Sequence, residues 1–76
     1  MPAKELAITK LKIENYMLIA TISDGQIVSI PIANFSRLRG ASEDKLNYFK
    51  ISPSGYGIHW PDLDEDISIK SFLSSL

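Results

Sequence analysis

Acidic side chains crowd beside the only histidine and the only tryptophan of this sequence. The stretch reads GYGIHWPDLDEDISIKSFL and covers residues 55–73. Carboxylates and an imidazole at this spacing are groups that bind divalent metal ions or transfer protons. The stretch therefore has three interpretations: a metal site, a catalytic pair, or a turn that begins the last helix.

The acidic run matches only the first half of a calcium-binding loop. Asp62 and Asp64 open a D-x-D-x-D pattern, but the sixth position, normally Gly, is Ile67 and the twelfth, normally Glu, is Leu73. A metal-dependent site at Asp62, Asp64 and His59 is therefore a minor alternative, and no metal or cofactor is predicted. The favoured interpretation is structural, because acids just before a helix satisfy free N–H groups and oppose the helix dipole.

The sequence lacks the parts of the common catalytic sites. With one His and no Cys, it supplies neither a zinc site nor a Ser-His-Asp triad. Residues 55–57 read GYG, which differs from the G-x-S-x-G nucleophile elbow. Two carboxylates without a nearby Arg do not suggest a glycosidase. We therefore predict that the chain is not an enzyme.

The His-Trp pair lies on a short predicted strand, so the two side chains should point to opposite faces. Trp60 shares a face with Ile58 and is predicted in the core, because it would bury a large area for so small a domain. His59 is predicted on the exposed face. The functional alternative is a docking surface for a partner protein. Its candidate residues are Tyr56, His59, Trp60, Asp62, Asp64, Glu65 and Asp66.

Length and composition indicate one small globular domain, residues 1–76, with 45% hydrophobic and 22% charged residues. The absence of Cys favours a reducing compartment. The N-terminus lacks the apolar segment of a signal peptide. The longest aliphatic run, residues 17–20, is too short to span a membrane. We expect a cytoplasmic protein without membrane contact.

The charges are unevenly distributed. Residues 62–66 hold four of the nine acids, so the rest of the chain has eight Lys and Arg against five acids, or +3. A nucleic-acid-binding regulator is the alternative function, with a basic patch formed by Arg37, Arg39, Lys45 and Lys50. Four scattered cations without a helix-turn-helix or RNP motif are more typical of a solvated helix surface.

Hydrophobic periodicity predicts an α+β fold that begins with a three-stranded antiparallel meander. Strands are predicted over residues 6–13, 16–22 and 26–30, and Asp24-Gly25 supplies a hairpin turn. Pro31 cannot donate a ladder hydrogen bond, so the third strand should end there or lie at an edge. A free sheet edge is also one route to a homodimer.

Short helices, a second hairpin and a C-terminal helix complete the predicted fold. Residues 33–39 are helix-like, and Ser42 is the expected N-cap of a second short helix. Strand character returns at residues 48–52 and 57–60. The last helix begins after Ser68. Its apolar stripe consists of Ile69, Phe72, Leu73 and Leu76.

Three segments resemble a bacterial family known as domain of unknown function 2442. They are SDGQIVSIPIANFSRL at residues 23–38, ASEDKLNYFKI at residues 41–51, and GYGIHWPDLDEDISIKSFL at residues 55–73. The last segment is the most distinctive. The resemblance covers about residues 6–73, and it implies a small α+β domain with no assigned catalytic residues.

The resemblance also implies a partner. Members of the family are frequently encoded beside a second small uncharacterised family, number 4160, in an arrangement similar to a toxin–antitoxin operon. Some longer relatives carry an appended helix-turn-helix domain, which this sequence does not show. We therefore expect a non-enzymatic, antitoxin-like interaction module that binds a small, more basic protein, with residues 62–66 steering the encounter.

Overall fold

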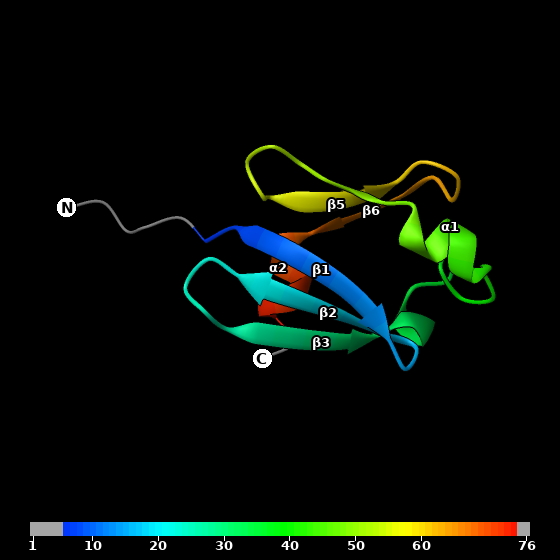
Figure 1. The fold of residues 1–76 in the computed structure, drawn as a ribbon, viewed down its shortest axis with the longest axis horizontal. Coiled ribbons are helices and arrows are strands. Elements are labelled where there is room, and N and C mark those ends of the chain that lie inside the picture. Colours follow the sequence, from blue (N-terminus) through cyan, green and yellow to red (C-terminus); the bar gives the residue numbers. More distant parts are fainter. Residues whose placement is uncertain (1–5, 75–76) are drawn as a thin grey trace.

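Two small antiparallel sheets and three short helical segments make up residues 6–74, the part that the computed structural model describes (Figure 1). The first sheet contains β1 (Ile8–Glu14), β2 (Met17–Ile22) and β3 (Ile27–Pro31), in that order. The second contains β4 (Lys50–Ile51), β5 (Gly57–Trp60) and β6 (Glu65–Ser68), in that order. The 3₁₀ helix η1 (Ile32–Asn34) and α1 (Glu43–Asn47) connect the sheets, and α2 (Ile69–Leu73) follows β6. The predicted α+β class with an initial meander is confirmed.

The first sheet has one buried and one exposed face. Leu11, Ala20 and Val28 lie side by side in the register, and all three are buried. The next row points the other way, so Lys12 and Ser29 are exposed. This alternation is what one-sided burial of an antiparallel sheet requires.

Tight turns set the register of the first sheet. Between β1 and β2, Asn15 and Tyr16 have φ of 51° and 60°, left-handed values typical of the two central positions of a type I′ turn. Tyr16, predicted to start the second strand, therefore belongs to the turn. Between β2 and β3, Gly25 adopts φ of 96°, and the predicted turn is confirmed. β3 lies at the sheet edge and ends at Pro31, as expected.

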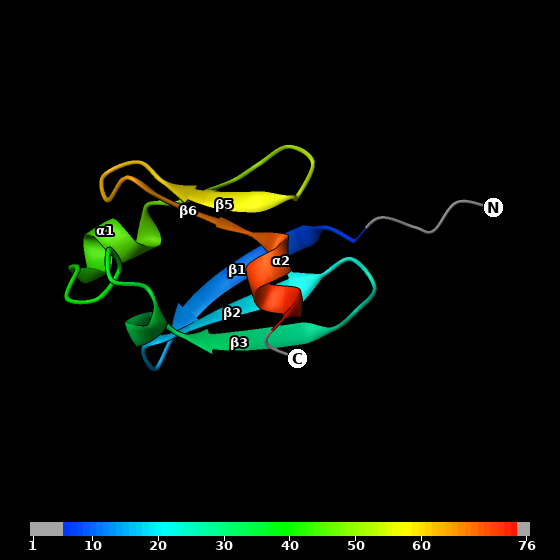
Figure 2. The same ribbon diagram turned by 180° about the vertical axis from the view of Figure 1, so that it is seen from behind.

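The core lies between the first sheet and a layer formed by α2 and the second sheet. Figure 2 shows α2 in front of the first sheet, with β5 and β6 beside β1. Ile69 and Phe72 of α2 are buried, which confirms the predicted stripe at these positions, and Leu73 is half-buried. Leu76 lies outside the described residues. The helices found in residues 6–74 are all too short to cross a membrane.

Trp60 joins the second sheet to α1. Its side chain is fully buried, as predicted for a core aromatic. Its indole Nε1–H donates to the carbonyl of Leu46 at 2.8 Å. That carbonyl lies near the end of α1, where helix carbonyls lack a partner in the helix itself. The ring also contacts Phe49, with the two centroids 6.0 Å apart. One aromatic side chain therefore fills core volume and satisfies a helix end.

The segment between β3 and α1 is less regular than predicted. Residues 33–39 do not form a helix, because η1 stops after one turn and Phe35 has an extended backbone with φ of −116° and ψ of 110°. Separate turns follow, and they bury Leu38. A helix this short has too few internal hydrogen bonds to form without tertiary support. α1 begins where predicted, with Ser42 Oγ accepting a backbone N–H of the first turn.

The acidic run does not cap the last helix, contrary to the prediction. Residues 61–64 form a turn, and Glu65 begins β6, a strand that the sequence did not indicate. The first turn of α2 contains no acidic residue. Ser68 occupies the N-cap position as predicted, but its side chain makes no capping hydrogen bond. Acids are poor strand formers, and only Ile67 is buried in β6, so local pattern was a weak guide here.

A close backbone contact joins the turn before β5 to β1. Gly55 is buried at φ of 73°, and its carbonyl accepts the N–H of Ile8 at 2.7 Å. A Cβ at this position would lie 2.6 Å from the Cβ of Ala7 and 2.8 Å from the carbonyl oxygen of Ile8. Only glycine permits both this conformation and this approach. The second sheet is therefore held against the first where backbone meets backbone.

Gly55→Ala is expected to lower the free energy of unfolding by about 2–4 kcal/mol, because it adds steric overlap to left-handed strain. Gly40→Ala is the matched control, since Gly40 has φ of 79° but open space around it. It should cost only about 1 kcal/mol. Urea unfolding of both variants measures the difference. Equal losses of unfolding free energy in the two variants would show that the close approach of Gly55 to β1 does not contribute to stability.

Trp60→Phe should lower the free energy of unfolding by about 1–3 kcal/mol, since the Leu46 carbonyl loses its buried donor. The same urea titration measures this loss, and Tyr48→Phe, at an exposed position, serves as control. An unchanged midpoint for Trp60→Phe would contradict the role assigned to the indole N–H.

Candidate functional site

The outer face of the second sheet carries the polar side chains of the acidic stretch and its surroundings. Lys50, His59 and Asp66 lie opposite one another in β4, β5 and β6. Directly opposed residues share a face, so all three point away from the core. In the next outward row, Gly57 lies opposite Ser68. Pairing of β5 with β6 therefore brings together side chains from both ends of the stretch.

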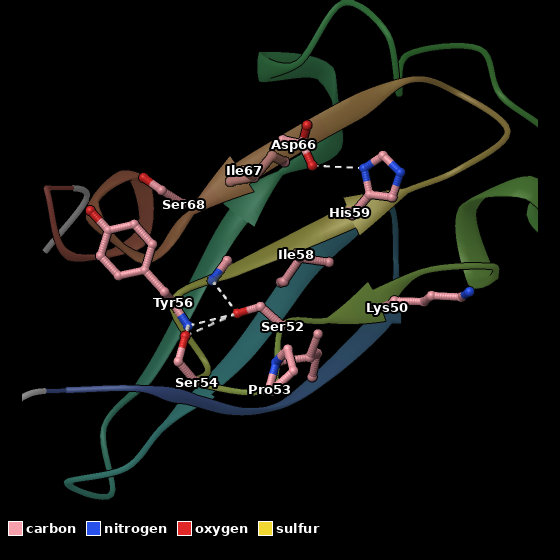
Figure 3. A pocket seen from close by; sticks show the side chains of 12 residues that line it. Lys50, Ser52, Pro53, Ser54, Tyr56, Ile58, His59, Asp66, Ile67 and Ser68 are labelled. Atoms are coloured by element: carbon pink, nitrogen blue, oxygen red, sulfur yellow. Dashed lines mark hydrogen bonds and ion pairs between the residues drawn. The ribbon is translucent and has the colours of Figure 1, made fainter.

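An open hollow of about 790 Å³ lies on this face (Figure 3). Tyr56 and Ser68 stand near one end, and His59 with Asp66 near the other. Because Gly57 contributes no side chain, strand backbone forms part of the floor. The residues around the hollow are Lys50, Ile51, Ser52, Pro53, Ser54, Tyr56, Gly57, Ile58, His59, Asp66, Ile67 and Ser68. The hollow is large enough to receive side chains of another molecule.

His59 and Asp66 hold each other in place at one end of the hollow. The Nδ1 of His59 lies 2.7 Å from the Oδ1 of Asp66. The two side chains remain 45% and 78% exposed, so the pair contributes at most about 1 kcal/mol to stability. Neither Nε2 of His59 nor Oδ2 of Asp66 has a partner within residues 6–74. The pair thus presents an oriented acceptor to an incoming group.

The turn between β4 and β5 positions Tyr56 at the other end. Ser52 Oγ accepts the N–H of Tyr56 at 3.0 Å and that of Gly57 at 3.2 Å. Ser54 Oγ also lies 3.3 Å from the Tyr56 nitrogen, which donates to it. Hydroxyls that accept nearby backbone N–H groups stabilise such turns. The backbone of Tyr56 is therefore fixed, while the residue as a whole stays 52% exposed.

The four acids of residues 62–66 have separate environments. Asp64 sits in the turn at φ of 50°, with its carboxylate 4.0 Å from the guanidinium of Arg37. Glu65 turns back, and its Oε1 accepts the N–H of Asp66 at 3.0 Å. Across the described chain, no three His, Asp or Glu side chains converge as metal ligands. The trio of the metal alternative, Asp62, Asp64 and His59, therefore does not form a ligand set.

The predicted docking surface is only partly contiguous. Tyr56, His59 and Asp66 surround the hollow. Trp60 is fully buried, so its side chain belongs to no surface. The other three acids lie in or beside the turn that follows β5, just beyond the His59 end.

The four residues of the predicted nucleic-acid patch have different environments. Lys50 lines the hollow, and Lys45 lies in α1. Arg39 donates to the carbonyl of Ala33 from Nε at 3.2 Å and from Nη2 at 2.9 Å. Arg37 faces the acidic turn. Two of the four cations thus already have partners within the chain, and nucleic-acid binding stays a prediction.

Sequence reasoning did not identify the hollow. The predicted second hairpin paired the strand of His59 only with residues 48–52, so without β6 its pairing with Asp66 was missed. The sequence also did not indicate that the hollow is lined by Ser52, Gly57 and Ser68. The one available signal was the polar–apolar alternation of Asp66, Ile67 and Ser68, which fits a one-sided strand.

Solved structures show the same fold. The chain superposes with a TM-score of 0.82 on a crystal structure of a protein of unknown function from Rhodospirillum rubrum, at 28% identity, covering 96% of this chain and 90% of the other. A solution NMR structure of an uncharacterized protein from Chromobacterium violaceum gives a TM-score of 0.75 at 20% identity. It covers 91% of this chain, and this chain spans 65% of that protein.

No curated protein matches the chain significantly. A family model, described as protein of unknown function DUF2442, matches residues 8–75, which include both sheets and both α-helices. The match agrees with the resemblance carried by residues 23–38, 41–51 and 55–73. The chain therefore belongs to the DUF2442 family.

Proposed function

We propose that the chain is a non-enzymatic interaction module that binds a small partner protein through the outer face of its second sheet. The observation that carries the proposal is the open hollow of about 790 Å³, which has the exposed ring of Tyr56 at one end and the acidic turn beyond the other. An aromatic anchor beside a polar rim is the usual anatomy of a protein interface.

Charge supports a basic partner. Residues 62–66 concentrate four carboxylates, and the one arginine paired with them, Arg37, lies 4.0 Å from Asp64 in an exposed contact among the described residues. An exposed charge cluster steers diffusional encounter with an oppositely charged surface, and salt weakens this steering. The acids would therefore act mainly on the rate of association, while apolar contacts in the hollow would act on dissociation.

Within this proposal, the chain has an antitoxin-like role. This role combines the gene arrangement implied by the family resemblance with an acidic surface suited to a small basic protein. In this role the chain would cover and neutralise the partner encoded beside it. Co-expression of the two proteins, followed by size-exclusion chromatography, tests this directly. A stable co-eluting complex supports the proposal, and separate elution of a lone monomer or homodimer contradicts it.

Asp62→Lys with Asp64→Asn should slow association with the co-eluting partner about tenfold at low salt, with little change in dissociation. Asn is chosen at position 64 because it tolerates the left-handed backbone there. Glu43→Lys with Asp44→Asn changes the charge equally on α1 and is the control. Surface plasmon resonance at two salt concentrations measures both rates. Equal slowing by the two double variants would rule out a role specific to the acidic turn.

A further inference from the structure

The geometry points to the class of segment that the hollow binds. We infer that it receives an extended, basic stretch of the partner, with one apolar side chain over Gly57 beside Tyr56 and one Arg or Lys, two residues away, at Asp66. This inference rests on the proposed function, because it names the chemistry that the same surface recognises.

The apolar position follows from what lines the hollow at the Tyr56 end. Gly57 adds no side chain there, and its neighbours across the sheet are the small residues Ser52 and Ser68. The Tyr56 ring and Pro53 supply carbon surface. None of these residues carries a charge, so an aliphatic side chain can be buried without desolvating an ion.

The place where the partner's cation binds follows from the hydrogen bonding of the Asp66 carboxylate. His59 occupies its Oδ1, while Oδ2 has no partner in the described part of the chain. A carboxylate held by one hydrogen bond needs less ordering when a guanidinium or ammonium group binds the other oxygen. Lys50 lies on the opposite side of His59 and would repel a second cation. A cation is therefore favoured on the β6 side, nearest the acidic turn. His59 serves as a positioning residue for Asp66.

The spacing fits an extended segment. Gly57 and His59 are two residues apart on one strand, which corresponds to about 6.6–6.8 Å along its axis. Residues i and i+2 of an extended partner segment have the same separation and point to the same side. An apolar side chain and a cation two positions apart would therefore reach the two ends of the hollow together.

The segment would lie on the face of the sheet and not add to its edge at Asp66. Ile69 donates its N–H to the carbonyl of Tyr56. Hydrogen-bonded and non-hydrogen-bonded pairs alternate along an antiparallel ladder, so the pair of His59 and Asp66, three places further on, is a non-hydrogen-bonded one. The N–H of Asp66 therefore points away from β5. Glu65 Oε1 already accepts that N–H at 3.0 Å. The Glu65 carboxylate thus occupies the N–H of Asp66, which an added antiparallel strand would need as a hydrogen-bond donor.

Titration of the ¹⁵N-labelled protein with the peptide acetyl-Ser-Leu-Ser-Arg-Ser-amide tests the inference by NMR. We expect amide shifts at Gly57, His59 and Ser68 that saturate with a Kd on the order of 1 mM, because so short a ligand buries little area. Two analogues, with Glu in place of Arg or Ser in place of Leu, should each bind at least about threefold more weakly. Equal binding of all three peptides, shifts confined to other faces, or no shift at 10 mM would overturn the inference.

Single substitutions test whether Tyr56 forms the apolar position of the hollow and Asp66 the cationic position. Asp66→Asn, which retains an acceptor for His59, should weaken the Arg peptide roughly two- to fivefold and should not weaken the Glu analogue, because it removes a charge that repels Glu. Tyr56→Ser should weaken the Arg and Glu peptides alike. Tyr48→Ser removes a similarly exposed tyrosine that does not line the hollow and should change nothing. Loss of Arg selectivity in Tyr48→Ser, or its retention in Asp66→Asn, would contradict the assignment.

The outcome of the peptide titration can be distinguished from the outcome of the co-expression experiment that tests the proposed function. A partner that co-elutes with the chain while the peptides fail to bind would leave the interaction module intact and remove only this recognition mode. Peptide binding at the hollow without a co-eluting partner would retain the recognition mode and reject the neighbouring gene product as its source.

Discussion

The contact between Gly55 and β1 is the constraint on which the rest of the structure depends. The strands of the second sheet are only two to four residues long, shorter than is usual, so this sheet needs support from the elements around it. Each sheet needs the other to cover its apolar face. The carbonyl of Gly55 accepts the N–H of Ile8 where neither Cβ nor side chain intervenes, so the turn before β5 is held directly against β1. That contact fixes where β5 begins, and with it the row of outward residues that surrounds the hollow.

The large buried side chains reinforce this arrangement from inside. Trp60 at the end of β5 fills the core and donates to the carbonyl of Leu46, which links the second sheet to α1. Phe72 of α2 packs into the same core from the other end of β6. The hydrogen bonds of Gly55 and Tyr56 hold the chain just before β5, and Trp60 holds its last residue, so the strand has little freedom to shift its register. The fixed register decides the chemistry of the outer face, because slipping by one residue would turn His59 inward and Ile58 outward.

The outer face of the second sheet consequently differs in chemistry from its inner face. The interior positions of its strands are used for the core, while the exterior ones are small, aromatic or charged. The hollow exists because Gly57 and two serines occupy consecutive places across the sheet, and the acidic turn adds negative charge at one end. Binding a segment of another protein requires no enclosed cavity, which a domain of this size has little volume to supply.

By itself, the sequence determined the elements whose signals are local. The strands of the meander, the turn at Asp24-Gly25, the cap at Ser42 and the burial of Trp60 all follow from alternation, turn chemistry and side-chain size. It also identified the acidic run, together with Tyr56 and His59, as the surface of interest. Only the tertiary structure decided that a single 3₁₀ turn and separate turns would replace the helix predicted over residues 33–39, and that Glu65 would start a strand, because both depend on covering a core formed by distant residues. The pairing of His59 with Asp66 and the hollow over Gly57 appeared for the same reason: they are properties of a strand pair, and β6 is stabilised by its neighbours more than by its own residues.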